Sequence, residues 1–424
     1  MTRRPDLPAD PVIRALVQQA RRERSQRERR FGPGDSGAVS RRSVLQLGAG
    51  MAGLAAVLTA CGTGGGATGT SSSAVQGRDV SATDKSVYWA NWTLYLDYDE
   101  ETQTYPTLET FQEQTGITVY YAEDIDDNDT YFGKVQGQLA RGQDIGQDII
   151  TLTDWMTARL IRLGYTQEFD RANIPNADNL LDGLKNVDFD PGRKNSLTWQ
   201  SGFAGIAWAN DRVPAGMRSV SDLWNPEYRG RVEVLSEMRD TVGLIMLEQG
   251  VDLAGAWGDD EFYAALAVLE EQITNGQIRQ VKGNSYKEDL ISGDAVAVIG
   301  WSGDITQINF ENDDRWSFAL PDAGGTIWSD NLMVPVGATH KRNAEELMNY
   351  YYDPAVAAQV AAWVNYICPV KGAQEAMAEI DPELVENPLI FPDDATLAKA
   401  HVFRTLTPEE ETRYNGDFLT AIGA

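Results

Sequence analysis

The hydrophobic and polar positions from Lys85 onward follow two alternating periods. Residues 86–90 place apolar side chains at every second position, which predicts a strand, and residues 99–114 have helical spacing. A stop at Thr115-Gly116 follows, because glycine readily adopts the left-handed conformation that ends helices. The same periods predict strands at 117–122 and 148–151, a helix capped by Asp129 at 129–141, and a helix at 155–163 ended by Gly164.

A second set of elements follows an extended crossover at residues 201–210. Strands are predicted at 232–235 and 295–299, and helices at 240–249 and 261–275. Alternating strands and helices are typical of α/β folds with a largely parallel sheet. For a chain of this length we expect two α/β lobes joined by extended segments rather than one large sheet.

Aromatic and acidic residues recur together near the predicted strand ends, where ligands bind in open α/β sheets. The set comprises Trp92, Tyr95, Thr153, Trp155, Glu237, Asp240, Trp301, Asp304, Trp328 and Asp330. Taken singly, each has an ordinary structural explanation: helix capping after Ser236, core packing for the indoles, or turn formation for the aspartates. Their coincidence favours a binding site.

The chain carries a formal charge of -27, from 63 acidic and 36 basic side chains among 424 residues. A surface this acidic repels nucleic acid and favours cationic ligands. Two Cys and two His are too few for a usual zinc site or a disulfide framework. We therefore expect no nucleic-acid partner, no metal and no cofactor. Amine cations match the candidate residues, because carboxylates hold ammonium groups while aromatic faces cover methylene spacers.

The charge is unevenly distributed along the chain. Residues 1–42 hold 11 Arg and 5 acidic side chains, so residues 61–424 hold the other 25 basic (36 - 11) and 58 acidic (63 - 5) side chains, a net of -33. Residues 1–39 are predicted to be a solvated basic arm. Residues 40–61 predict a signal, with a twin arginine before an apolar run that is too short to span a membrane.

The signal ends in Leu58-Thr59-Ala60-Cys61-Gly62, which resembles the lipobox of bacterial lipoproteins. That resemblance implies that Cys61 is acylated and holds the chain at the extracytoplasmic or periplasmic face of the cell membrane. Residues 62–84 are then predicted to form a flexible Gly/Ser/Thr-rich linker. The other cysteine, Cys368, is predicted to be a small buried apolar residue.

Two other kinds of chemistry are disfavoured by the residues present. Asp124 to Asn128 has the opening rhythm of a calcium loop, but Asp129 occupies the glycine position and Val135 the final acidic position. Neither a nucleophile motif nor a phosphate loop occurs in the sequence.

Five segments in consistent order carry a resemblance to a known family: VYWANWTLY (87–95), FQEQTGITV (111–119), SDLWNPEYRG (221–230), GWSGD (300–304) and IWSDNL (327–332). The chain from about residue 85 to 375 resembles the bacterial spermidine/putrescine-binding proteins of ABC transporters. The resemblance implies an α/β, bilobed periplasmic-binding-protein fold whose two lobes close on a polyamine about a hinge. Lobe one would comprise residues 85–200 and 328–376, and lobe two residues 201–327 and 377–424.

The resemblance also implies a set of site residues. An aromatic box would be formed by Trp92, Tyr95, Trp155, Trp301, Trp328 and Tyr366, and polar anchors would be Thr93, Thr153, Glu237, Asp240, Asp304 and Asp330. Leu94 departs from the family, which often has a polar or acidic residue there. Residues 152–155 also depart from it: by the resemblance, Trp155 would narrow the pocket and Asp154 would add a charge. The choice of amine therefore stays open.

These observations predict a monomeric, lipid-anchored solute-binding protein that is not an enzyme and that delivers a polyamine to the permease subunits of an ABC transporter. One alternative is a binding protein for an uncharged solute such as a sugar, whose affinity would change little with salt. Another is a secreted hydrolase with a carboxylate pair between the lobes, which would turn over a substrate.

Overall fold

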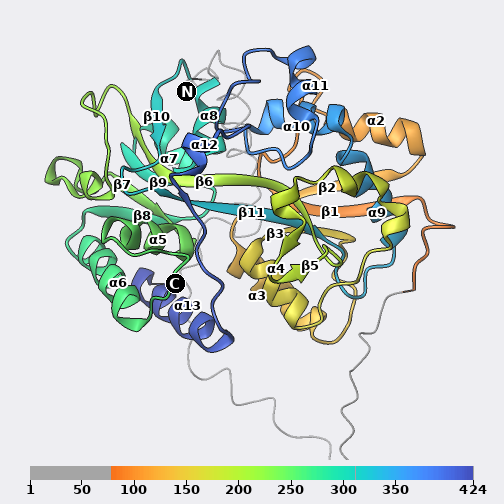
Figure 1. The fold of residues 1–424 in the computed structure, drawn as a ribbon, viewed down its shortest axis with the longest axis horizontal. Coiled ribbons are helices and arrows are strands. Elements are labelled where there is room, and N and C mark those ends of the chain that lie inside the picture. The colour runs from red at the N-terminus through yellow and green to blue at the C-terminus, as the bar shows by residue number, and fades with distance from the viewer. Residues whose placement is uncertain (1–77, 311, 424) are drawn as a thin grey trace, which may run out of the picture. The chain divides into compact units, whose positions relative to one another are not determined.

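The computed structural model describes residues 78–310 and 312–423 (Figure 1). The predicted basic arm, the signal with Cys61 and most of the predicted linker lie outside the described residues. Among the described helices, none has both the length and the apolar character needed to cross a membrane.

The first group of elements alternates strand and helix, as the sequence predicts. It consists of β1 (Ser86–Trp92), α2 (Pro106–Thr115), β2 (Thr118–Ile125), α3 (Asn128–Leu139), β3 (Ile149–Thr153) and α4 (Asp154–Arg162). Strand β1 lies between β2 and β3 and is parallel to both. The predicted stop is confirmed, because Gly116 has φ 70° and caps α2.

Two helix starts in this group differ from the prediction. Helix α2 begins at Pro106 rather than at 99, because proline suits the first helical position and Asp99 pairs with Thr104 in a preceding turn. The cap of α3 is Asp127, whose carboxylate accepts a hydrogen bond from the Thr130 amide at 3.0 Å, and not Asp129. The acidic run that starts at Asp124 therefore ends a strand and caps a helix.

The second group has the same alternating pattern. It contains β7 (Val232–Leu235), α5 (Met238–Glu248), α6 (Asp259–Thr274), β8 (Ile278–Lys282), α7 (Tyr286–Ser292), β9 (Ala297–Trp301) and α8 (Ser302–Phe310). Strand β7 lies between β8 and β9 and is parallel to both. Within this group, helices α5 and α6 pack against each other (Figure 1).

Two long strands join the groups. Strand β6 (Leu197–Ala209) is buried along all its 13 residues and pairs antiparallel with β11 (Gly325–Met333). Strand β11 also pairs with β3, and β6 with β9, so the strand order is β2-β1-β3-β11-β6-β9-β7-β8. The expectation of two α/β lobes rather than one large sheet is therefore wrong in one respect: the joining segments pair with each other, and one sheet runs through both groups. Its centre is antiparallel.

The remaining elements complete both groups. They are β4 (Asn186–Val187), β5 (Asp190–Pro191), β10 (Trp316–Ala319), α9 (Lys341–Tyr351), α10 (Pro354–Val364), α11 (Ala373–Ile380), α12 (Asp394–Leu397), β12 (Ala400–His401) and α13 (Pro408–Ile422). After α12 the chain crosses in front of the central strands, where β12 pairs with β11, and α13 then packs against α6 (Figure 1). The prediction that Cys368 is buried is confirmed. The lobe boundaries stay a prediction.

Candidate functional site

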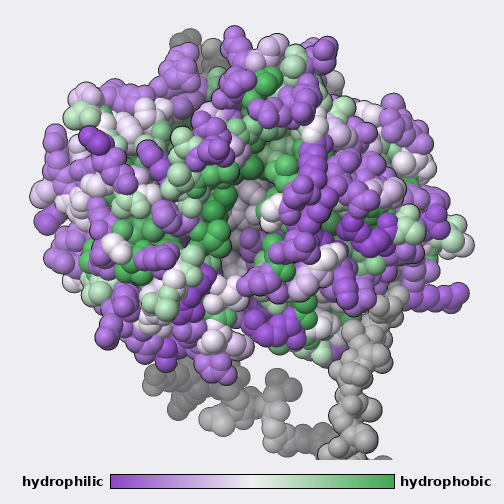
Figure 2. All heavy atoms as spheres, in the orientation of Figure 1, coloured by the Kyte–Doolittle hydropathy of each residue, from purple (hydrophilic) through white to green (hydrophobic). Residues whose placement is uncertain are grey.

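A cavity of about 1110 Å³ lies between the two groups of elements. The face shown in Figure 2 is hollowed at its centre, and hydrophobic residues gather around the hollow while polar residues cover the flanks. All the predicted site residues line this one cavity: Trp92, Thr93, Tyr95, Thr153, Trp155, Glu237, Asp240, Trp301, Asp304, Trp328, Asp330 and Tyr366. Its lining contains twelve Asp or Glu residues against four Lys or Arg, so the cavity favours cations.

Five aromatic rings form a continuous wall of this cavity. The ring centroids of Trp92 and Trp301 lie 6.5 Å apart, those of Trp301 and Trp328 6.2 Å, and those of Trp328 and Tyr366 5.3 Å. Tyr95 then meets Tyr366 edge to face at 5.3 Å. The rings come from β1, β9, β11, the turn after β1 and the segment after α10, so chain positions far apart converge on one surface.

Two glycines make room for this wall. A Cβ atom at Gly202 would lie 2.5 Å from the Trp328 ring, and one at Gly303 would lie 2.5 Å from the Tyr366 ring. Atoms cannot approach this closely, so any larger residue at either position would displace an aromatic ring of the cavity.

Two of the predicted anchors have a cationic partner within the protein. Asp304 accepts hydrogen bonds from the Lys287 ammonium and the Tyr366 hydroxyl, both at 3.0 Å. Glu237 lies 3.7 Å from the Arg239 guanidinium and accepts hydrogen bonds from the Trp155 indole at 3.0 Å. Each of these two carboxylates therefore has a cation beside it before any ligand enters.

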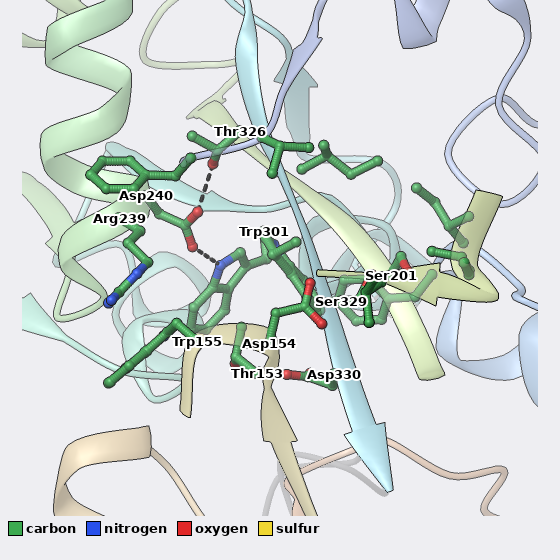
Figure 3. A pocket seen from close by; sticks show the side chains of 18 of the residues that line it. Thr153, Asp154, Trp155, Ser201, Arg239, Asp240, Trp301, Thr326, Ser329 and Asp330 are labelled. Carbon is green, nitrogen blue, oxygen red and sulfur yellow. Dashed lines mark hydrogen bonds between the residues drawn. The ribbon is translucent and has the colours of Figure 1, made fainter. Parts of the chain in front are cut away.

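Two further anchors are held only by neutral donors. Asp240 accepts hydrogen bonds from the Trp301 indole at 2.8 Å and from the Thr326 hydroxyl at 2.6 Å (Figure 3). Asp330 accepts a hydrogen bond from the Thr153 hydroxyl at 2.7 Å. In the described part of the chain, no Lys or Arg nitrogen lies within 4.0 Å of either carboxylate. Both are almost fully buried.

Asp154 adds a carboxylate beside this pair. It begins α4 directly after β3 and accepts a hydrogen bond from the Asn331 amide at 2.7 Å. The same Asn331 side chain accepts a hydrogen bond from buried Arg193 at 2.8 Å, so this cation is one side chain away from Asp154. Figure 3 shows the Asp154 carboxylate between Trp301 and Thr153.

Burial raises the pKa values of these acids, because water no longer solvates their charged forms. The pKa of Glu237 is raised to about 8, that of Asp330 to about 7, and those of Asp240 and Asp154 to about 6, in each case mainly by burial. Neighbouring acids add to the effect at Glu237 and Asp330. A cation entering the cavity would favour the ionised forms.

The expectation that the site residues follow strand ends holds for some of them. Thr153, Trp301 and Trp92 are the last residues of their strands. Trp328 and Asp330 instead lie within β11, which contradicts the expectation. They reach the cavity because β11 is one of the two strands that cross between the groups.

Several polar residues of the site were not predicted. They include Arg239, Lys287, Thr326 and Asn128, and Asn128 donates to both Thr153 and Glu237. Arg239 also stacks on Trp155, with its guanidinium 4.1 Å from the ring centroid. Arg239 could have been found, because it lies between the predicted anchors Glu237 and Asp240 in the sequence. Nothing in the sequence indicates that Lys287 contacts Asp304.

Comparisons with known proteins agree with this architecture. The model of the family described as bacterial extracellular solute-binding protein matches residues 107–392, which is more than half of the chain. This chain belongs to that family. A bacterial extracellular solute-binding protein is a transport component, so family membership argues against the hydrolase alternative. It also supports a periplasmic or extracellular location.

Curated relatives and solved structures show the extent of the similarity. The spermidine/putrescine-binding periplasmic protein of Escherichia coli is 26% identical over 345 residues, covering 80% of this chain and 88% of that protein. The putrescine/agmatine-binding protein of Pseudomonas aeruginosa is 26% identical over 350 residues, covering 77% and 91%. The spermidine/putrescine ABC transporter substrate-binding protein of Streptococcus pneumoniae superposes with a TM-score of 0.64 at 23% identity, covering 80% and 98%. This solute-binding protein therefore has the predicted α/β bilobed fold.

Proposed function

We propose that this solute-binding protein captures polyamines and delivers them to the permease of an ABC transporter. The observation that carries the proposal is the pair Asp240 and Asp330, two buried carboxylates without a cationic partner beside a wall of aromatic rings. The similar proteins of Escherichia coli and Pseudomonas aeruginosa, which are named for binding spermidine, putrescine or agmatine, support the same ligand class.

The energetics of burial favour a cation over a neutral solute. A buried charge without a partner is costly, and a ligand that supplies the opposite charge removes much of that cost. A sugar hydroxyl would donate a hydrogen bond to Asp330 but would leave its charge uncompensated. Ammonium groups compensate the charge, and their methylene spacers pack on the indole faces, worth roughly 0.5–2 kcal/mol for each cation–aromatic contact.

Closure of two lobes about the crossing strands is the proposed mechanism of capture. With lobe one at residues 85–200 and 328–376, and lobe two at 201–327 and 377–424, the cavity lies between the lobes. The contacts across the cleft would then include the hydrogen bond that Trp155 donates to Glu237 and the one that Ser236 donates to Asp127 at 2.7 Å. Ligand binding would favour the state in which these contacts form, and the permease would accept the closed form.

We also propose that the chain acts as a monomer anchored by lipid on Cys61. The twin arginine at Arg41-Arg42 and the lipobox-like segment support export followed by acylation. Each buried methylene of an acyl chain contributes about 0.8 kcal/mol to membrane binding, so a multiply acylated Cys61 would hold the protein at the outer face of the cell membrane. The part of the predicted linker before Val80 would then let the binding lobes reach the permease, whereas from Val80 the chain is held to the fold by the hydrogen bond from its amide to the Thr339 carbonyl at 2.8 Å.

Thermal denaturation with a panel of solutes tests this function. We expect spermidine or putrescine at millimolar concentration to raise the melting temperature, because a ligand that binds only the folded state stabilises it. Sugars and neutral amino acids serve as matched controls and should have no effect. If neither amine shifts the melting temperature, or if a sugar shifts it more, the polyamine assignment is wrong although the fold is correct.

The raised pKa values predict opposite effects of pH on the free and the bound protein. A carboxyl whose pKa is higher in the folded than in the unfolded chain stabilises folding below the raised value, and this stabilisation is lost as the pH rises through it. The pKa of Asp330 is raised to about 7, against about 3.9 in an unfolded chain.

From about pH 4 to about pH 7, the melting temperature of the ligand-free protein is therefore expected to fall. Amine affinity is expected to rise over the same range, because ionised carboxylates bind cations better. Melting curves with and without spermidine across this range check both trends. Amine affinity that stays constant with pH would show that these carboxylates do not contact the ligand.

A further inference from the structure

Two tyrosines of the aromatic wall directly follow residues whose backbone is in the left-handed region. Leu94, with φ 57°, precedes Tyr95, and Asn365, also with φ 57°, precedes Tyr366. Asparagine adopts this conformation readily, whereas the Cβ atom of a leucine lies too close to the following carbonyl oxygen there. The backbone of Leu94 is therefore strained and persists only because neighbouring groups hold it.

Side chains from two different elements hold the backbone of Leu94. Its amide donates a hydrogen bond to the Glu123 carboxylate at 2.9 Å, and its carbonyl oxygen accepts one from the side-chain amide of Gln307 at 3.0 Å. Glu123 lies on β2 and Gln307 on α8. Tyr95 is the next residue, and its almost fully buried ring meets Tyr366 edge to face. The position of the Tyr95 ring thus depends on these two hydrogen bonds.

The Gln307 amide also holds the turn before the second tyrosine. It donates another hydrogen bond to the Val364 carbonyl oxygen, again at 3.0 Å. Val364 is the last residue of α10, and Asn365 caps this helix in its left-handed conformation. Both N–H groups of one side-chain amide thus bind backbone carbonyls, and the turns that carry Tyr95 and Tyr366 are joined through it.

Gln307 lies on the face of α8 that packs against Tyr366. Gly303 and Asp304 precede it by four and three residues, so the three side chains share one face of the helix. A Cβ atom at Gly303 would lie 2.5 Å from the Tyr366 ring, and Asp304 accepts a hydrogen bond from the Tyr366 hydroxyl at 3.0 Å. Unlike Asp304, Gln307 does not line the cavity. It therefore affects a ligand through the residues that it holds.

We infer that Gln307 is a positioning residue that keeps Tyr95 and Tyr366 in contact within the aromatic wall. The inference rests on the proposed polyamine function. Without the Gln307 amide, Leu94 is free to leave the strained left-handed region, and Tyr95 moves with it. A ligand that packs on the tyrosine pair then binds only the fraction of molecules in which the pair is formed, and this lowers its apparent affinity.

Calorimetry with spermidine on the Gln307→Met variant of the whole chain tests this role. Methionine keeps an unbranched side chain of similar length and has no N–H group to donate. We expect spermidine binding to weaken by about fivefold, because the loss of one hydrogen bond typically changes an equilibrium constant by a factor of roughly 2–13.

Gln277→Met is the matched control for a general loss of stability. The Gln277 side-chain amide likewise donates to two backbone carbonyls, those of Leu223 at 2.7 Å and Asn225 at 2.8 Å, and Gln277 does not line the cavity. Because Gln277 is almost fully buried, its replacement should lower the melting temperature at least as much as Gln307→Met does. It should change spermidine affinity by less than about twofold, as expected for a distant site.

A second substitution at the strained turn tests whether Gln307 acts through Leu94. Asparagine adopts the left-handed backbone readily, so a turn with Leu94→Asn no longer depends on the Gln307 amide. We expect Gln307→Met to weaken spermidine binding by less than about twofold when it is made in the Leu94→Asn protein.

The possible outcomes separate the positioning role from the function. Equal spermidine affinities of Gln307→Met and the wild type would overturn the role of Gln307 while leaving the polyamine function intact. The same follows if Gln277→Met loses as much affinity, or if Leu94→Asn leaves the effect of Gln307→Met unchanged. Absence of spermidine binding by the wild type would overturn the proposed function itself.

Discussion

Replacing Asp330 with asparagine is expected to weaken spermidine binding by about 30-fold or more, measured by calorimetry at about pH 8, where the wild-type carboxyl is ionised. Removing one partner of a buried charge pair typically costs about 2–5 kcal/mol. Asparagine keeps the size of the side chain, and its carbonyl oxygen still accepts the hydrogen bond from Thr153. The loss should therefore reflect the missing charge and not a changed fold.

Two control measurements test whether the effect of Asp330→Asn comes from the lost charge. Glu375→Gln removes the same charge from an exposed position of the cavity and should change affinity by less than about threefold, because exposed charges are screened over roughly 10 Å. The ligand-free Asp330→Asn protein should melt no lower than the wild type at about pH 8, since a buried unpaired charge has been removed. Equal affinities of Asp330→Asn and wild type for spermidine would place the ligand elsewhere.

Replacing Glu411 with glutamine is expected to lower the free energy of unfolding by about 3 kcal/mol. Glu411 is 5% exposed and accepts hydrogen bonds from Arg159 at 3.2 Å and from Arg162 at 2.6 Å. Arg239 lies 3.8 Å away. Helix α13, which carries Glu411, also packs against α6 through the hydrogen bond from Tyr414 to Asp259 at 2.6 Å. Without the Glu411 charge, three clustered arginines repel one another.

Chemical denaturation followed by tryptophan fluorescence measures this loss. Glu409→Gln is the matched control, since Glu409 is exposed in the first turn of the same helix and its replacement should change stability by less than about 0.5 kcal/mol. If Glu411→Gln and Glu409→Gln denature alike, the arginine cluster does not depend on Glu411 for its stability.

Much of the fold could be predicted from the hydrophobic pattern, because several helices have one buried and one exposed face, and the buried strands β3, β7 and β9 are short apolar runs. The start of α2 could not be predicted in this way. Helical spacing continues through 99–105, and only Pro106 marks the first turn of the helix. The continuous sheet could not be predicted either. Strand β6 is buried on both faces and therefore has no alternation, and pairing with β11 joins residues more than 100 positions apart.

The candidate site was predictable as a set of ligand-facing residues but not as an electrostatic arrangement. The side chains that convergent strands bring together, such as Trp92, Trp301 and Asp330, could be named from their positions in the sequence. The internal cations could not, because Lys287 on α7 meets Asp304 only through tertiary packing. Because these cations pair with Asp304 and Glu237, Asp240 and Asp330 are the acidic anchors that remain without a cation among the described residues, and these two carboxylates favour a positively charged ligand.

Titration calorimetry with spermidine at about pH 7, in two buffers that differ in ionisation enthalpy, tests most directly whether buried carboxylates hold a cation. We predict saturable binding that weakens with salt and that releases protons, because the bound amine shifts Asp330, whose pKa is raised to about 7, toward its ionised form. Binding without proton release and without dependence on salt would contradict the account, as would a sugar that binds with equal affinity.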